Sequence, residues 1–148
     1  MPPALHHIGF VVSSIAPALE GFLRSLNASW DERIFEDPIQ KVRVAFLTTH
    51  PGEPQIELVE PVGESSPVRK FLQEKGGGLH HFCYETDNLE SEVQSFRSRH
   101  AILVRHPAPA VAFEGRKIAW VLTREHLLVE LLEKHRTSDA GEEKGNQE

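Results

Sequence analysis

The chain has 148 residues, 39% of them hydrophobic, which is enough for one globular domain with a buried core. Its formal net charge of −6 argues against a nucleic-acid partner, because phosphate binding requires a basic surface. No apolar run reaches the roughly 18 residues of a membrane span, and the amino terminus lacks the pattern of a signal peptide. The single cysteine, Cys83, cannot form an intrachain disulfide, so we expect a cytoplasmic protein without a membrane partner.

The first half of the chain is predicted to fold as βαβββ. Residues 5–12 are apolar and rich in strand-forming side chains. A helix is expected over residues 15–26, since apolar side chains recur at helical spacing after Ser14, a candidate N-cap. Three further strands are predicted at residues 30–35, 41–48 and 55–60. A proline- and glycine-rich turn at 51–54 separates the last two.

The second half repeats this order after a connector, residues 62–78. The connector contains a short predicted helix that starts near Pro67 and ends at three glycines, residues 76–78. A strand over 79–86 and a helix capped by Asp87 or Asn88 follow. Strands are then predicted at residues 101–104, 116–122 and 127–132.

These elements predict one α+β domain over residues 1–135, made of two tandem βαβββ modules. The modules span 5–61 and 79–134. Residues 136–148 are polar and lack periodicity, so we expect a mobile tail.

A His-His pair opens each module, and an acid inside an apolar strand follows each pair. His7 and His81 are 74 residues apart (81 − 7 = 74). Glu57 follows His7 by 50 residues (57 − 7 = 50), and Glu130 follows His81 by 49 (130 − 81 = 49). A repeat of this length indicates a duplicated supersecondary unit rather than a solenoid.

Each of these four residues also has an ordinary interpretation when taken singly. A glutamate in a strand usually lies on the solvated face, and a lone histidine is usually a hydrogen-bonded structural residue. Their joint recurrence favours convergence around a pseudo-twofold axis, with nitrogen and oxygen donors suited to Zn, Co, Ni, Mn or Fe. Because adjacent residues of a strand face opposite ways, His6 and His80 are expected to point away from such a site.

The other candidates for chemistry are the cysteine and a group of basic residues. Cys83 is expected to be a packed core thiol, because nothing near it in the sequence suggests an activated thiolate. Four basic residues near predicted strands are candidates to bind an anionic substrate, and the alternative is that they are solvated charges on the strand surface. They are Lys41, Arg43, Arg116 and Lys117.

The chain resembles the vicinal oxygen chelate superfamily of glyoxalases, bleomycin-resistance proteins, extradiol dioxygenases and epimerases. The resemblance covers residues 5–134 and is greatest to the methylmalonyl-CoA epimerase branch. The motifs that carry it are His6-His7-Ile8-Gly9, Val42-Arg43-Val44-Ala45-Phe46-Leu47, Ile56-Glu57-Leu58-Val59-Glu60-Pro61, Ser66-Pro67-Val68-Arg69-Lys70-Phe71-Leu72, Gly78-Leu79-His80-His81 and Leu128-Val129-Glu130-Leu131.

The resemblance implies a curved mixed sheet around a metal cleft, with His7, Glu57, His81 and Glu130 as the metal ligands. It implies an isomerase or epimerase that removes a proton alpha to a carbonyl through a metal-stabilised enediolate. Glu130 is the first candidate for the base, and Glu57 is the second. The implied partners are a small-molecule substrate, such as an acyl-CoA thioester, and a second copy of the chain in a homodimer.

Two alternatives to the epimerase stay open. One is a glyoxalase I-type lactoylglutathione lyase, and the other is a non-catalytic protein that binds an antibiotic or another small molecule, as bleomycin-resistance proteins do. An extradiol dioxygenase is disfavoured, because its iron is held by two histidines and one carboxylate. The chain also departs from the epimerase pattern at Phe113, where a histidine is usual, and at Val44, where some members carry a carboxylate.

Overall fold

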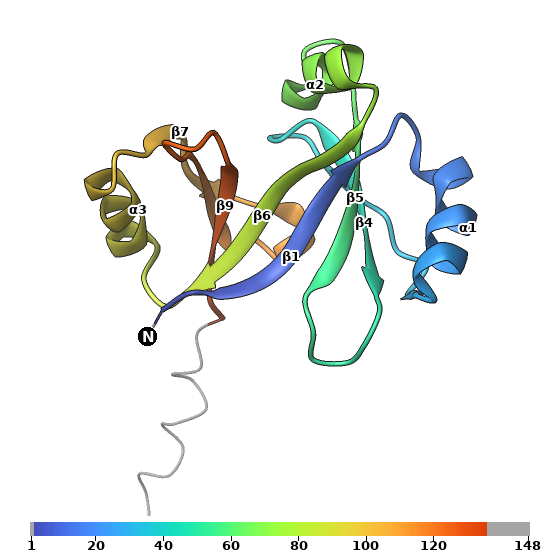
Figure 1. The fold of residues 1–148 in the computed structure, drawn as a ribbon, viewed down its shortest axis with the longest axis horizontal. Helices are drawn as coiled ribbons and strands as arrows, with labels where there is room; N and C mark the ends of the chain where they lie inside the picture. The colour runs from blue at the N-terminus through green and yellow to red at the C-terminus, as the bar shows by residue number, and fades with distance from the viewer. Residues whose placement is uncertain (1, 136–148) are drawn as a thin grey trace, which may run out of the picture.

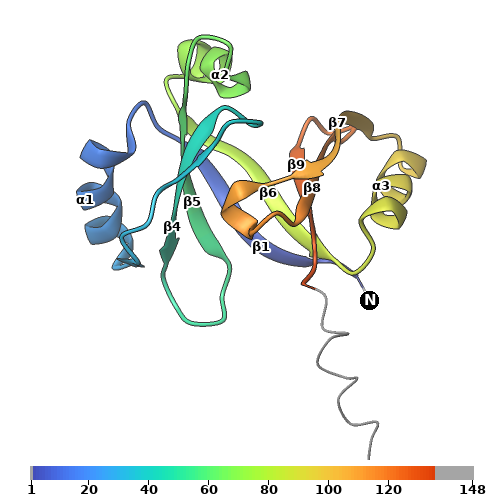
Figure 2. The ribbon, with the colours of Figure 1, turned by 180° about the vertical axis from the view of Figure 1, so that it is seen from behind.

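Residues 2–135 are described by a computed structural model, shown from two sides in Figures 1 and 2. The first half contains β1 (Ala4–Val11), α1 (Ile15–Leu26), β2 (Ser29–Trp30), β3 (Phe35–Asp37), β4 (Val42–Thr48) and β5 (Gln55–Pro61). The connector holds α2 (Pro67–Lys75). The second half contains β6 (Gly78–Thr86), α3 (Leu89–Ser98), β7 (Ile102–Pro109), the short 3₁₀ helix η1 (Val111–Phe113), β8 (Lys117–Leu122) and β9 (Leu128–Glu133).

The strands form one mixed sheet in the order β2-β4-β5-β1-β6-β9-β8-β7, with β3 added to β4. β1 runs parallel to β5 and β6 runs parallel to β9, whereas the central β1–β6 pair is antiparallel. Figure 1 shows β1 and β6 crossing the middle of a curved sheet, with α1 and α3 at opposite flanks. The predicted fold class, an α+β structure with a curved mixed sheet, is confirmed.

Each long helix packs on the strands of its own half. α1 places Ile15 and Leu19 against a cluster that includes Leu47 and Leu58. α3 does the same with Leu89 and Val93, which pack on the equivalent strands β8 and β9. Burial of such a side chain stabilises the fold by about 1.5–3 kcal/mol. Since side chains alternate along a strand, Glu57 and Glu130 face away from the helices, toward the other side of the sheet.

The predicted α1 is confirmed, but the interaction at its start differs from the expected one. Ser14 is the N-cap residue by backbone geometry, yet its side chain makes no capping hydrogen bond. Instead, the backbone N–H of Ile15 donates to Glu60 Oε1 at 2.7 Å, so a carboxylate from β5 caps the helix.

Two predicted strands are corrected by the structure. The strand expected at 30–35 is divided into β2 and β3, because a turn intervenes in which the Arg33 N–H donates to Asp31 Oδ1 and Glu32 takes a positive φ of 65°. The strand expected at 101–104 continues to Pro109. β7 is an edge strand with register shifts, and such a strand accepts prolines because their missing N–H breaks no central ladder.

The remaining predictions concern the ends of the chain and the membrane. The expected mobile tail, residues 136–148, lies outside the described residues. Over residues 2–135, no helix is long and apolar enough to cross a membrane.

Candidate metal centre

The backbone register brings the two histidines and the two glutamates to one place. β1 pairs with β5 so that Gly9, two residues after His7, lies opposite Glu57. β6 pairs with β9 in the same register, so that Cys83, two residues after His81, lies opposite Glu130. The antiparallel pairing of β1 with β6 then joins the two sets across the middle of the sheet.

The four side chains converge, and all four residues are nearly buried, with at most 5% of the residue surface exposed. His7 Nε2 lies 3.1 Å from Glu130 Oε1 and 3.3 Å from Glu57 Oε1. His81 Nε2 lies 3.1 Å from Glu57 Oε1 and 3.3 Å from Glu130 Oε1. One chain therefore supplies all four groups, and a homodimer is not needed to complete the set.

The donor spacing fits a single divalent ion. Two bonds of about 2.1 Å that meet at 90–110° place their donor atoms about 3.0–3.4 Å apart. The two Nε2 atoms, which are 3.3 Å apart, and the neighbouring nitrogen–oxygen pairs match this range. Two imidazole nitrogens that face each other cannot both point a proton along that line without repulsion. An ion bonded to both removes this conflict, so the chemistry of the donor set suits a metal.

The ionisation of the four groups depends on their mutual contacts. Burial by itself raises the pKa of Glu57, but the charge of His7 and the hydrogen bonds from His7 and His81 outweigh it and lower the pKa. The same balance lowers the pKa of Glu130. Burial by itself lowers the pKa of His81, whereas the hydrogen bonds to Glu130 and Glu57 raise it above its usual value. The pKa of His7 is likewise raised, against burial, by the Cys83 thiol and the carboxylates. Both carboxylates are therefore charged at neutral pH.

His6 and His80 do not point away from the site, which corrects the expectation from simple alternation. The β1–β6 ladder shifts register between Leu5 and His7 and again between Gly9 and Phe10, opposite His80. Each shift is a β-bulge, which turns two successive side chains toward one side of the strand. His6 Nδ1 therefore lies 2.8 Å from His7 Nδ1, and His80 Nδ1 lies 2.9 Å from His81 Nδ1.

The outer histidines orient the inner ones. Burial and the neighbouring histidine lower the pKa of His6, and they lower the pKa of His80 to about 4. A neutral His6 or His80 can accept a hydrogen bond from the Nδ1–H of its neighbour, which leaves Nε2 of His7 and His81 directed at the carboxylates. This is the usual arrangement around metal-binding histidines, whose second nitrogen is held by a hydrogen bond.

Gly9 leaves the space that the His81 ring occupies. A Cβ atom at this position would lie 2.1 Å from His81 Cε1 and 2.4 Å from Nδ1. Position 9 thus tolerates no side chain without displacement of a site residue.

Cys83 is a packed thiol, as predicted. It is fully buried, and burial raises its pKa to about 12, so it is neither exposed nor activated as a nucleophile.

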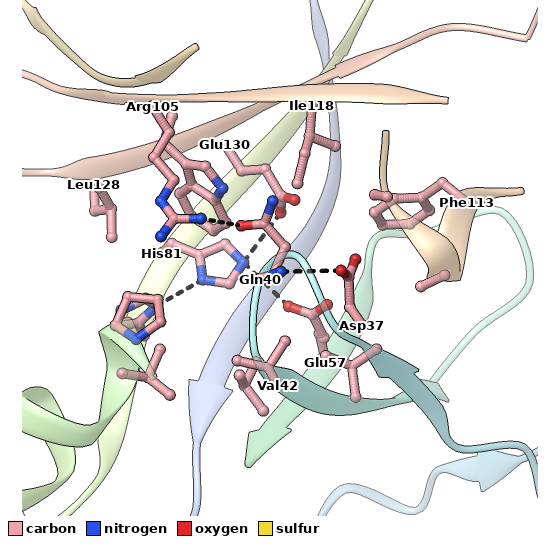
Figure 3. Close-up of a pocket in the computed structure, with 18 of the residues that line it drawn as sticks. Asp37, Gln40, Val42, Glu57, His81, Arg105, Phe113, Ile118, Leu128 and Glu130 are labelled. Carbon is pink, nitrogen blue, oxygen red and sulfur yellow. Dashed lines mark hydrogen bonds and ion pairs between the residues drawn. The ribbon is translucent and has the colours of Figure 1, made fainter. Parts of the chain in front are cut away.

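A cavity of about 230 Å³ adjoins three of the four groups, namely Glu57, His81 and Glu130 (Figure 3). Its wall is mainly apolar, with valines from β4, β5 and α2 on one side and Ile118, Trp120 and Leu128 on the other. The polar residues at its border are Asp37, Gln40, His80 and Arg105. A small organic group bound in this cavity would lie next to the converging donors.

The basic residues expected to meet an anion do not line the cavity. Arg43 pairs with Glu36 and Glu60, and Arg116 pairs with Glu85. The cation at the cavity is Arg105, which the sequence did not single out because the strand was expected to end before it. Trp120 was missed as well, although its offset of 74 from Phe46 was a usable signal.

Comparison with known proteins identifies a family model and two relatives. The model of the Glyoxalase/Bleomycin resistance protein/Dioxygenase superfamily matches residues 6–120. The uncharacterized protein YqjC of Bacillus subtilis is 37% identical over 133 residues, which are 87% of this chain and 91% of that protein. Human mitochondrial methylmalonyl-CoA epimerase is 30% identical over 96 residues, which are 64% of this chain and 53% of that protein.

A solved structure agrees with these matches. The crystal structure of methylmalonyl-CoA epimerase from Mycobacterium tuberculosis superposes with a TM-score of 0.78 at 27% identity. The match covers 93% of this chain and 92% of that one.

Proposed function

Because the chain belongs to the glyoxalase/bleomycin resistance/dioxygenase superfamily, we propose that it is a divalent-metal-dependent epimerase that acts on an acyl-CoA thioester such as methylmalonyl-CoA. The observation that carries this proposal is the convergence of two histidines and two carboxylates beside an apolar cavity. The similarity to methylmalonyl-CoA epimerases supports the choice of substrate class.

His7, Glu57, His81 and Glu130 would hold the ion. A divalent ion in this place supplies Lewis-acid polarisation of a substrate carbonyl, which acidifies the proton on the adjacent carbon. His6 and His80 keep the inner imidazoles oriented, and burial leaves the four donors little exposed outside the cavity.

Glu130 is proposed as the base that removes the proton. Its lowered pKa keeps it charged and able to accept a proton at neutral pH. It lines the cavity beside its cross-strand partner Trp120 of β8, and Arg105 of β7 lines the same cavity. Glu57, across the pseudo-twofold axis, is the second candidate for this base, since its lowered pKa also keeps it charged.

The test combines metal content with isotope exchange. Purified, reconstituted protein is analysed for bound divalent metal and is then incubated with methylmalonyl-CoA in deuterated water. We expect about one metal ion per chain and metal-dependent incorporation of deuterium alpha to the carbonyl. Protein that binds no metal would rule out both the epimerase and the glyoxalase-type lyase. Metal binding without exchange would rule out the epimerase and direct attention to the lyase.

A further inference from the structure

The two walls of the cavity differ in their hydrogen-bonding capacity. Apart from Asp37, Gln40 and the metal-site Glu57, the wall from the first half is formed by Val42, Val44 and Val59, which offer no side-chain donors. The wall from the second half includes Trp120 and Arg105, both of which are donors only. A ligand with one apolar side and one oxygen-rich side would match this division.

The indole N–H of Trp120 has no acceptor. Among the described residues, Trp120 Nε1 is buried and lacks a hydrogen-bond partner. A buried donor without a partner is uncommon in a folded protein and requires an explanation. The other tryptophan, Trp30, is ordinary in this respect, because its Nε1 donates to Arg33 O at 3.0 Å. Trp120 also packs edge-on against the ring of His81, with centroids 4.7 Å apart, so its N–H lies near the candidate metal centre.

Arg105 is held only weakly. Its guanidinium donates to Gln40 Oε1 at 3.5 Å, which is at the outer limit of a hydrogen bond. Figure 3 shows this contact at the cavity, with Arg105 reaching from the second half toward Gln40 of the first. Arg105 is also the cross-strand partner of Trp120, so the two side chains are neighbours on β7 and β8.

We propose that Arg105 and Trp120 bind the free carboxylate of the acyl group and thereby select thioesters that carry one. In the bound state Arg105 leaves Gln40 and pairs with the carboxylate. This movement gives a carboxylate oxygen access to the Trp120 N–H, which is otherwise out of contact with solvent. The inference rests on the proposed function, since it takes an acyl-CoA thioester as the ligand, but it concerns binding rather than turnover.

Calorimetric titration of metal-loaded protein tests the selection. The probes are racemic methylmalonyl-CoA and propionyl-CoA, which lacks the carboxylate. We expect the wild type to bind methylmalonyl-CoA at least about 10-fold more tightly, because a hydrogen bond to a charged group is strong. Arg105→Met should weaken its binding about 10–100-fold and Trp120→Phe about 5-fold, with binding of propionyl-CoA and the metal content unchanged.

Two variants serve as matched controls. Arg97→Met removes a guanidinium from the exposed side of α3, and Trp30→Phe removes an indole N–H that already has an acceptor. Neither should alter the preference between the two thioesters. In a ¹⁵N spectrum of the wild type, the Trp120 indole resonance should shift with methylmalonyl-CoA and not with propionyl-CoA.

The outcomes separate this inference from the proposed function. A wild type without preference for the carboxylate, or variants that lose both probes equally, would overturn the pairing of Arg105 and Trp120 with the anion, even if deuterium exchange proceeds. A retained preference in the wild type that both variants lose, without any exchange, would support the pairing and refute the epimerase.

Discussion

The two halves of the molecule place their donors in the same way but surround them differently. In each half, the residue two positions after the histidine faces the glutamate across a parallel strand pair. Phe46 and Trp120 then occupy equivalent positions and contact His7 and His81 edge-on, at 5.4 and 4.7 Å. The strand register is the same in the two halves, whereas the side chains around the histidines differ.

Because the two halves differ in their side chains, the site is open on one side. His7 is fully buried, but His81 borders the cavity. The position opposite the glutamate is Gly9 in one half and Cys83 in the other, so the two histidines do not have the same space around them. Duplication accounts for a symmetric set of donors, and the differences between the halves account for a cavity that borders His81 and not His7.

Replacing each carboxylate by an amide should reveal the largest difference between the two halves. We expect Glu130→Gln to reduce deuterium exchange about 10²–10⁴-fold, the contribution of a general base, while thermal unfolding shows an intact fold. Glu57→Gln, which keeps an oxygen donor, should reduce exchange less. Metal content measured on both variants separates loss of the base from loss of the ion. Full activity of Glu130→Gln would show that the base has been misassigned.

A methyl group at Gly9 should disturb the histidine of the opposite half. Gly9→Ala places a Cβ atom against the ring of His81, so we expect a loss of about 1–3 kcal/mol in the free energy of unfolding and weaker metal binding. Gly21→Ala in α1 is the control, because a Cβ atom there meets nothing within 4 Å and alanine favours a helix. Chemical denaturation and metal titration measure both. Normal metal affinity in Gly9→Ala would contradict the described packing of His81.

Replacement of His6 and His80 tests whether the two β-bulges orient their neighbouring histidines equally well. His6→Phe and His80→Phe each remove the acceptor for an inner histidine, and we expect metal affinity to fall about 10–100-fold in each case. Competition with a chelator provides the measurement. If one variant alone loses affinity, the two halves do not orient their ligands equally.

The metal-free protein should show a characteristic dependence of stability on pH. The lowered pKa values of Glu57 and Glu130 contribute stability that is present above about pH 4.5 and is lost as the pH falls. The raised pKa values of His7 and His81 contribute stability that is present below about pH 6.5 and is lost as the pH rises through their folded values. We therefore expect maximal stability between these limits. Unfolding midpoints that keep rising above pH 6.5 without metal would contradict this.

The sequence allowed most of the fold and the convergence of the donors to be predicted, because both follow from local periodicity and from the repeat. Alternation within β5 and β9 is enough to direct Glu57 and Glu130 to one side of the sheet. The orientation of His6 and His80 could not be predicted in this way, since it depends on bulges that arise only when β1 and β6 pair. The position of Arg105 depends on pairing at a proline-containing edge strand, which periodicity does not reveal.

The long separation of the donors in the chain has a consequence for when the ion can bind. His7 and Glu130 contact each other across 123 residues of sequence, so the site exists only after both outer modules and the central strand pair have formed. A small zinc module, by contrast, gathers its ligands locally and folds around the metal. In this protein the ion cannot guide early folding, and the rate of refolding should be the same with and without it. Metal uptake by the proposed site would thus be the last step of maturation, and it would report that the whole sheet has assembled.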